Sequence, residues 1–311
     1  MVFSPRRDFA GGGVIMKFIV KANATTANIG SGFDCLGLAL DLKNEIFVSD
    51  EGDAPLVIRA GAGVPADESN LIYRAMKSVF DAVGKRPRSV TVEQTDRIPM
   101  TSGMGSSAAC AVLGITAGNA LTGNTLGLRE IIDLATKIDG HPDNVLPCIV
   151  GGATAAVMKS DGSGVEEYVR VPISDKLFAV ALTPDFPFAT EKARKVLPAV
   201  YPKADVVYSL SRAVVSFAAL AAGEPEKLKC VGDKLHQPYR TPLIPGFDAA
   251  SAALKNAGAL CTFLSGAGPT VLGIFEEKNG VSRDGIAVAA PEKWTKRVLG
   301  FDNKGVVVEG A

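Results

Sequence analysis

The chain has 311 residues, of which 47% are hydrophobic and 21% charged, a balance typical of globular proteins that excludes a disordered chain. Thirty-three basic residues balance 33 acidic ones, so we expect neither a nucleic acid nor a membrane as partner. Five scattered cysteines without a C-x-x-C pair, together with only two histidines, exclude a zinc or multi-histidine centre and fit reduced thiols in the cytoplasm.

The first half of the chain alternates predicted strands and helices. Residues 1–15 lack the apolar region of a secretory signal, and we expect a flexible N-terminal extension there. Alternating apolar runs predict the strands, and apolar residues three and four apart predict the helices. The strands are expected at 16–23, 44–50, 55–60, 89–94 and 151–160, and the helices at 70–83, 107–120 and 128–138.

The second half has the same mixed character. The turn-forming tract Asp161–Gly164 is interpreted as the hinge between an N-terminal domain at 16–164 and a C-terminal domain at 165–311. Strands and helices in both halves, with unequal spacing, indicate an α+β fold. The expected strands are 165–172, 177–183, 259–265 and 270–276, and the expected helices are 190–197, 204–222 and 248–257.

A glycine- and serine-rich segment at 99–109, PMTSGMGSSAA, directly precedes a predicted helix. Gly103 and Gly105 allow the backbone to approach a ligand closely, and the free N–H groups of a helix starting at Ser106 and Ser107 favour an anion. A serine-capped buried helix without a ligand is the alternative. A Walker A loop is excluded because no Gly-Lys-Ser/Thr occurs, and a dinucleotide fingerprint lacks its later acidic residue.

Two further glycine-rich loops lie far away along the chain. The first, at 27–34 (ANIGSGFD), follows the first strand, and the other, at 265–270 (SGAGPT), joins two apolar strands near the C-terminus. Each alone is typical of a tight turn. Three such loops, each beside serine, threonine, asparagine or aspartate, favour one common site.

Together these three segments resemble the signature motifs of the GHMP small-molecule kinases, a family that includes galacto-, homoserine and mevalonate kinases. Residues 99–109 resemble the family phosphate loop P-x-x-x-G-L-G-S-S-A-A, with Met104 in place of leucine. The segment ANATTANIGSGFDCLGLAL is similar to the homoserine kinase version of the first motif. The resemblance covers roughly residues 17–277 and implies a left-handed βαβ N-terminal domain beside a ferredoxin-like C-terminal domain.

The resemblance also implies roles for single residues. ATP would bind through the phosphate loop, with Asn70 on the adenine side; Ser107 and Asp133, eight residues before His141, would hold Mg²⁺. Asn144 would orient the acceptor hydroxyl, with Asp143 as a weaker candidate for a base. The implied nucleotide-binding residues are Asn70, Pro99, Ser102, Gly103, Met104, Gly105, Ser106, Ser107, Ala108 and Ala109. The implied substrate-binding residues are Asn28, Asp34, His141, Thr190, Arg194 and Arg240.

The residue types at the implied acceptor site fit an amino-acid alcohol. Homoserine is a zwitterion, and two arginines can grip its carboxylate while Asp34 pairs with its ammonium group. The expected activity is transfer of phosphate from ATP to the hydroxyl of L-homoserine. A GHMP kinase for another small alcohol and a non-catalytic ligand sensor on the same fold are the alternatives. A homodimer is compatible with the sequence.

Overall fold

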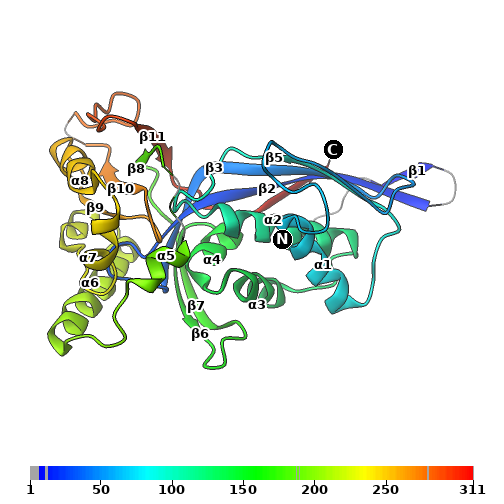
Figure 1. The fold of residues 1–311 in the computed structure, drawn as a ribbon, viewed down its shortest axis with the longest axis horizontal. Helices are drawn as coiled ribbons and strands as arrows, with labels where there is room; N and C mark the ends of the chain where they lie inside the picture. Colours follow the sequence, from blue (N-terminus) through cyan, green and yellow to red (C-terminus); the bar gives the residue numbers. More distant parts are fainter. Residues whose placement is uncertain (1–6, 11–12, 187, 189, 279, 311) are drawn as a thin grey trace.

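The computed structural model describes residues 7–310 apart from 11–12, 187, 189 and 279, and it contains two β-sheets with helices packed beside them (Figure 1). The first sheet has eight strands. Its main path is β1 (Arg7–Ala10), β2 (Gly13–Ala27), β3 (Leu36–Ser49), β5 (Val90–Thr95) and β4 (Leu56–Arg59). Three strands pair outside this path: β12 (Val307–Gly310) with β2, β6 (Ala153–Met158) with β3, and β7 (Val165–Val171) with β6.

The second sheet is antiparallel throughout and has four strands in the order β11 (Trp294–Gly300), β8 (Leu177–Pro184), β10 (Val271–Glu276) and β9 (Cys261–Leu264). Numbered in chain order, these strands lie 4-1-3-2, the arrangement of a ferredoxin-like sheet. In the first sheet, β4 and β5 are parallel and connected through a helix, which makes a βαβ unit. The predicted α+β class with two domains is confirmed.

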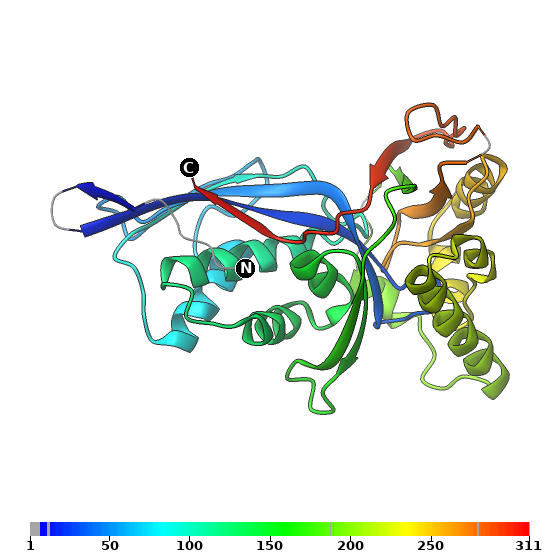
Figure 2. The ribbon, with the colours of Figure 1, turned by 180° about the vertical axis from the view of Figure 1, so that it is seen from behind.

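Four helices cover one side of the first sheet (Figures 1 and 2). They are α1 (Leu71–Val83), α2 (Ser106–Leu121), α3 (Leu128–Asp139) and α4 (Pro142–Val150). The second sheet is accompanied by α5 (Thr190–Lys195), α6 (Lys203–Ala222), α7 (Gln237–Arg240) and α8 (Phe247–Asn256), with 3-10 turns at Pro225–Cys230 and Thr241–Leu243. α2 is apolar on every side, so it can only be stable as a buried helix between the sheet and the other helices.

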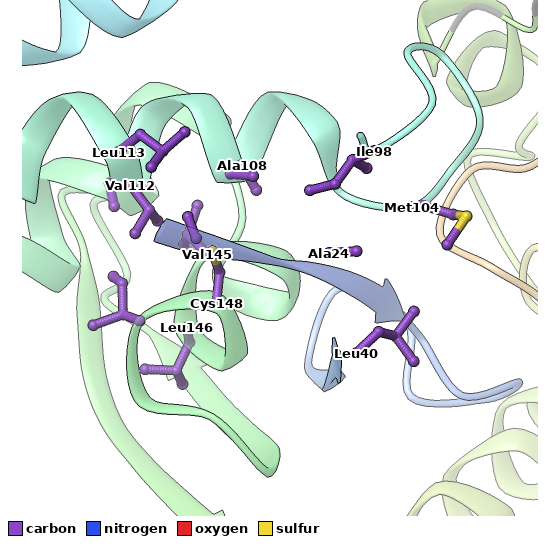
Figure 3. Close-up of a cluster of buried hydrophobic side chains, with 14 of the residues drawn as sticks. Ala24, Leu40, Ile98, Met104, Ala108, Val112, Leu113, Val145, Leu146 and Cys148 are labelled. Atoms are coloured by element: carbon purple, nitrogen blue, oxygen red, sulfur yellow. The ribbon is translucent and has the colours of Figure 1, made fainter. Parts of the chain in front are cut away.

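The main hydrophobic core lies between the first sheet and α1–α4. Figure 3 shows part of it, to which β2 contributes Ala24, α2 contributes Val112, and α4 contributes Val145 and Cys148, all fully buried. α1 begins at a side-chain cap, because Asn70 accepts hydrogen bonds from the first free N–H groups of the helix. It ends at Gly84 in the left-handed conformation, where the sequence predicts its end.

Several sequence predictions differ from the structure. The tract 161–164 is not an interdomain hinge but the turn of the β6–β7 hairpin, so the first sheet continues past residue 164. The C-terminal β12 also returns to that sheet beside β2 (Figure 2). Part of the expected N-terminal extension, Arg7–Ala10, is paired with β2, while residues 1–6 and 11–12 lie outside the described residues. α4 was missed because Pro142 and Pro147 mask its helical pattern.

Among the described helices, α6 is long and apolar enough to cross a membrane, by length and composition only. Less than a quarter of the residues in its most apolar 18-residue stretch are buried. It packs against the 3-10 turn at Pro225–Cys230 and against β6.

Candidate active site

The three glycine-rich loops meet around a cavity of about 340 Å³ between the two sheets. Residues from α2, α4, α5 and α7 and from the β2–β3 and β9–β10 loops line it, although they are up to 239 positions apart in the sequence. Of the predicted site residues, the structure places these on its wall: Asn28, Asp34, Ser102, Gly103, Gly105, Ser106, Ser107, Ala108, His141, Asn144, Arg194 and Arg240. The prediction that the loops form one site is therefore confirmed.

The third glycine loop supports the phosphate loop from behind. Gly103 has φ +81° and packs so closely that a Cβ atom there would lie 2.4 Å from the carbonyl oxygen of Ser265. The Ser265 hydroxyl donates a hydrogen bond to the Gly103 carbonyl at 2.7 Å, and the Thr270 amide donates to the Ser102 carbonyl at 3.1 Å. Only glycine fits at this contact, which holds residues 102–105 in place.

Gly105 turns the phosphate loop into α2. It has φ +69°, and a Cβ atom at this position would lie 2.0 Å from Oγ1 of Thr25 on β2. Gly105 is also the N-cap residue of α2, and no side chain caps that helix end. The first N–H groups of the 16-residue helix are therefore available to an anion, at the positive end of its dipole.

A second cavity, of about 260 Å³, adjoins the first and shares Thr101, Ser106 and Ser107 with it. Asn70 lines this second cavity. Its Oδ1 accepts from the amides of Ile72 and Tyr73, and its Nδ2 donates to the Pro65 carbonyl at 2.8 Å. The Asn70 side chain thus fixes the start of α1 and the loop beside it, and it shapes the cavity through these two elements. We call the wall that residues 101–108 form in these two cavities the nucleotide end.

Three predicted residues of the phosphate loop lie behind it. Met104 is fully buried in the core, where Figure 3 shows it, and Ala109 is buried in α2. Pro99 accepts a hydrogen bond from the Ser102 hydroxyl at 2.7 Å through its carbonyl oxygen. None of the three lines either cavity, so their side chains support the loop rather than face a ligand. Thr190 begins α5, and its side chain lies outside the described ones.

Asp133, predicted to hold Mg²⁺, is wrongly placed for that role. Its carboxylate forms an ion pair with Lys159 at 2.6 Å and accepts a hydrogen bond from the Val165 amide at 2.9 Å. It lines neither cavity. Asp139, at the end of the same helix, lines the first cavity and accepts a hydrogen bond from the Ser107 hydroxyl. Six residues along a helix amount to a rotation of about 120°, so the two carboxylates face different sides.

Sequence reasoning missed Asp139, although a signal was present. It stands two residues before His141, in the sequence DGHPDN, and so at the junction of α3 and α4 that enters the cavity. Burial raises its pKa to about 6, which the hydrogen bond from Ser107 opposes. A carboxylate and a hydroxyl side by side offer the oxygen donors that hard cations prefer.

Asp143 and Asn144 begin α4 on the floor of the cavity. Burial, with the nearby charges of Asp34 and Asp139, raises the pKa of Asp143 to about 8, so this carboxyl is protonated at neutral pH. Asn144 Nδ2 donates to Asp143 at 3.3 Å, and Asn144 Oδ1 accepts from the Thr25 hydroxyl at 2.8 Å. The orientation of the Asn144 amide is thereby fixed by β2.

Another part of the cavity wall carries charged side chains, and we call it the acceptor end. Arg194 and Asp34 form an ion pair at 3.0 Å and remain partly exposed. Arg240 is only 1% exposed and donates from Nε to the Ala193 carbonyl at 3.1 Å. Asn28 Nδ2 donates to the Gly266 carbonyl, while its Oδ1 accepts from the Asp34 amide. His141 completes the wall, and burial lowers its pKa.

Comparisons with known proteins agree with this arrangement. The family models for the N-terminal and C-terminal domains of GHMP kinases match residues 70–152 and 215–293. A homoserine kinase of Clostridium botulinum is 41% identical over 293 residues, covering 93% of this chain and 97% of that protein. A homoserine kinase of Caldicellulosiruptor bescii is 40% identical over 298 residues, with coverage of 93% and 96%.

Solved structures show the same architecture. The crystal structure of a homoserine kinase from Cytophaga hutchinsonii has a TM-score of 0.81 and 27% identity, covering 97% of this chain and all of that one. A mevalonate kinase structure with a TM-score of 0.67 and 13% identity shares the fold. The two domain matches, the identity of about 40% along nearly the whole chain and the phosphate loop at its cavity lead to one conclusion. The chain belongs to the GHMP kinase family, among its homoserine kinases.

Proposed function

We propose that the protein transfers the γ-phosphoryl group of ATP to the side-chain hydroxyl of L-homoserine, giving O-phospho-L-homoserine and ADP. Threonine biosynthesis in the cytoplasm is the corresponding proposed role. One observation carries the choice of acceptor: two guanidinium groups and a carboxylate, from Arg194, Arg240 and Asp34, line the same cavity as the phosphate loop. This set matches a small molecule with both an ammonium and a carboxylate group.

The ion pair between Arg194 and Asp34 gives such a zwitterion a way to bind. Their side chains are 37% and 28% exposed, so the pair is accessible from the cavity. A bound amino acid would place its carboxylate near the guanidinium groups and its ammonium near Asp34. Each charge in the pocket would then keep an opposite partner, which limits the desolvation cost of binding.

Positioning is the main catalytic contribution that these side chains support. The Thr25 hydroxyl holds Asn144 Oδ1, so the Asn144 Nδ2 group is directed and can donate to the acceptor hydroxyl oxygen. Asp143 is a poor candidate for the base, because burial raises the pKa of its carboxyl and favours the protonated form. The hydroxyl proton would therefore pass to an oxygen of the transferred phosphoryl group as the new P–O bond forms and the bond to ADP breaks.

The residues at the phosphate loop fit Mg²⁺. Ser107 and Asp139 offer hydroxyl and carboxylate oxygens, the donors that this cation prefers. No group of three or more histidine, cysteine or acidic side chains suited to a metal occurs among the described residues. Phosphate oxygens and water would therefore supply most of the ligands, as is usual for Mg²⁺ at nucleotides. Bound there, the cation would neutralise charge on the β- and γ-phosphates.

One assay tests the proposal: ADP release from ATP with homoserine, homoserinol, mevalonate and galactose as acceptors. We expect turnover with homoserine and very little with homoserinol, which lacks the carboxylate. Equal rates with homoserine and homoserinol would favour a kinase for another alcohol. ATP binding without ADP release for any acceptor would favour a ligand sensor. The predicted homodimer stays a prediction, which light scattering of the purified protein can measure.

A further inference from the structure

A buried histidine that lines no part of the cavity stands directly behind its acceptor end. We infer that His236 is a positioning residue, which aims the guanidinium group of Arg240 into the cavity through a hydrogen bond between the two side chains. The inference rests on the proposed role of Arg240 in binding the acceptor carboxylate. It adds a residue that would act on the acceptor without touching it.

Two hydrogen bonds of the His236 ring indicate its protonation state, and the Asp233 carboxylate lies farther away, 3.6 Å from Nε2. Nε2 lies 2.6 Å from the Gly30 carbonyl oxygen, which can only accept, so Nε2 must carry a hydrogen. Nδ1 lies 3.2 Å from Nη1 of Arg240, which can only donate, so Nδ1 must present its lone pair. Both requirements are met by one neutral tautomer of the imidazole. A second proton would remove the acceptor and place a cation beside Arg240.

Arg240 is held on three sides, and His236 supplies one of them. Its Nε donates to the Ala193 carbonyl, and its Nη1 donates both to His236 and to the Gly266 carbonyl at 3.3 Å. Within the described part of the chain, Nη2 has no hydrogen-bond partner, and Arg240 lines the cavity. Nη2 is thus the donor left for a ligand, and the bonds to Nε and Nη1 determine where it points.

The backbone at His236 is anchored by hydrogen bonds that do not involve its ring, although their acceptor, Asp233, also lies 3.6 Å from Nε2. The carboxylate of Asp233 accepts hydrogen bonds from the amides of Leu235, His236 and Gln237 at 2.7–2.9 Å. The ring itself stacks on Phe33 of the first glycine loop, with ring centroids 5.1 Å apart and planes 20° apart. A substitution of the ring should therefore leave α7 in place and change mainly what Arg240 contacts.

Two variants of His236 separate the hydrogen bond to Arg240 from other effects. His236→Leu and His236→Asn both lose the bond to Gly30, but the asparagine oxygen can occupy the Nδ1 position and accept from Arg240. We expect His236→Leu to raise the KM for homoserine about tenfold, with the KM for ATP changed less than twofold. His236→Asn should recover most of this loss. The preference for homoserine over homoserinol should fall in His236→Leu and return in His236→Asn.

A purely structural role for His236 would change these measurements differently. It would lower the melting temperature and the amount of active enzyme, while both KM values and the homoserine preference stayed as in the parent. Equal KM values in the leucine and asparagine variants, or a normal homoserine preference in His236→Leu, would overturn the inference. If His236→Leu does not fold, His236→Gln against His236→Asn gives the same comparison, because glutamine reaches the Nε2 position instead.

The Arg240→Leu variant distinguishes this inference from the proposal on which it rests. If Arg240→Leu leaves the KM for homoserine unchanged, the carboxylate site itself is wrongly assigned. If Arg240→Leu raises that KM while His236→Leu does not, the carboxylate site stands and only the positioning role of His236 is wrong.

Discussion

The nucleotide end and the acceptor end of the cavity are built in different ways. The nucleotide end consists mainly of backbone from one continuous segment, residues 101–108, and of the first turn of α2. The acceptor end consists of side chains carried by four separate segments: the first glycine loop, α4, α5 and α7. A backbone site depends on conformation, which a short motif specifies, whereas a side-chain site depends on how distant segments pack.

The two ends also differ in their electrostatics. The nucleotide end offers free N–H groups at a helix terminus, which suit phosphates of any nucleotide. The acceptor end offers discrete charges at Asp34, Arg194 and Arg240, which suit one pattern of charge in a small ligand. Selectivity for the acceptor should therefore reside in side chains that can be changed without loss of ATP binding.

The largest effect is expected for Gly105→Ala at the nucleotide end. The new Cβ atom would lie 2.0 Å from Thr25 Oγ1 and 3.2 Å from Asn144 Oδ1, so the loop and β2 would have to separate. We expect ATP binding and turnover below detection, measured by calorimetric titration and ADP release. Gly223→Ala is the matched control, because Gly223 has φ +70° but nothing within 4 Å of a Cβ atom. Intact ATP affinity in Gly105→Ala would contradict the assignment of this loop.

The next largest effect is expected for Asp139, whose carboxylate lies between the nucleotide end and the acceptor end. Asp139→Asn should lower kcat about 100-fold and shift the Mg²⁺ titration to higher concentration, because charge stabilisation at the phosphates is lost. Asp133→Asn is its counterpart on the same helix. We expect that variant to keep the parent Mg²⁺ curve and to lose about 1 kcal/mol of unfolding free energy or less, since its partner Lys159 is 38% exposed. A shifted Mg²⁺ curve in Asp133→Asn would reverse the assignment.

A selective loss is expected at the acceptor end for Arg240→Leu. A charged hydrogen bond without its buried partner costs about 1.5–3 kcal/mol, so kcat/KM for homoserine should fall at least about tenfold. ATP affinity, which depends on the other end of the cavity, should remain. Arg240→Lys keeps the charge but loses the planar fork, and it should recover only part of the loss. Equal losses of ATP and homoserine binding would mean that the two ends are not independent.

The last effect concerns stability rather than activity: a pH dependence of stability from Asp143, which lies between the two ends. Its folded pKa of about 8 lies above the unfolded value of 3.8, so the folded state favours the neutral carboxyl. This contribution to stability is complete below pH 3.8 and decreases as the pH rises toward 8. Urea denaturation should therefore show the parent losing more unfolding free energy between pH 5 and pH 8 than Asp143→Asn. Parallel pH profiles for the two proteins would contradict the raised pKa.

Much of the nucleotide end could be predicted from the sequence. Glycines at 103 and 105 followed by two serines and an apolar run specify a loop that turns into a buried helix, and the structure has both. The reason is local: only glycine tolerates these positive φ angles at so close a contact, and an uncapped helix start follows at once. The third glycine loop, at 265–270, was predictable as part of the site only through its resemblance to a family motif.

The acidic residue beside the phosphate loop shows where local pattern is insufficient. Asp133 and Asp139 are both acidic residues of α3, and the count of eight residues before His141 selected the one that faces Lys159. Which side of a helix meets a cavity depends on its packing against neighbouring elements, which spacing along the chain does not determine. The β6–β7 hairpin was not predicted for a related reason. A turn between two domains and a turn within one sheet have the same composition, so the residues 161–164 alone do not distinguish them.

The sequence alone therefore determined the fold class, the family and the loops that meet at the cavity, because these depend on local conformation and on motifs of contiguous residues. Only the tertiary structure decided that Asp34 pairs with Arg194, that Asp139 adjoins Ser107 and that His236 lies behind Arg240. The Asp34–Arg194 and Asp139–Ser107 pairs join side chains from different segments, so their contacts form only after the two sheets and their helices have packed. His236 and Arg240 are four residues apart on one helical turn, but packing alone brings that turn to the cavity.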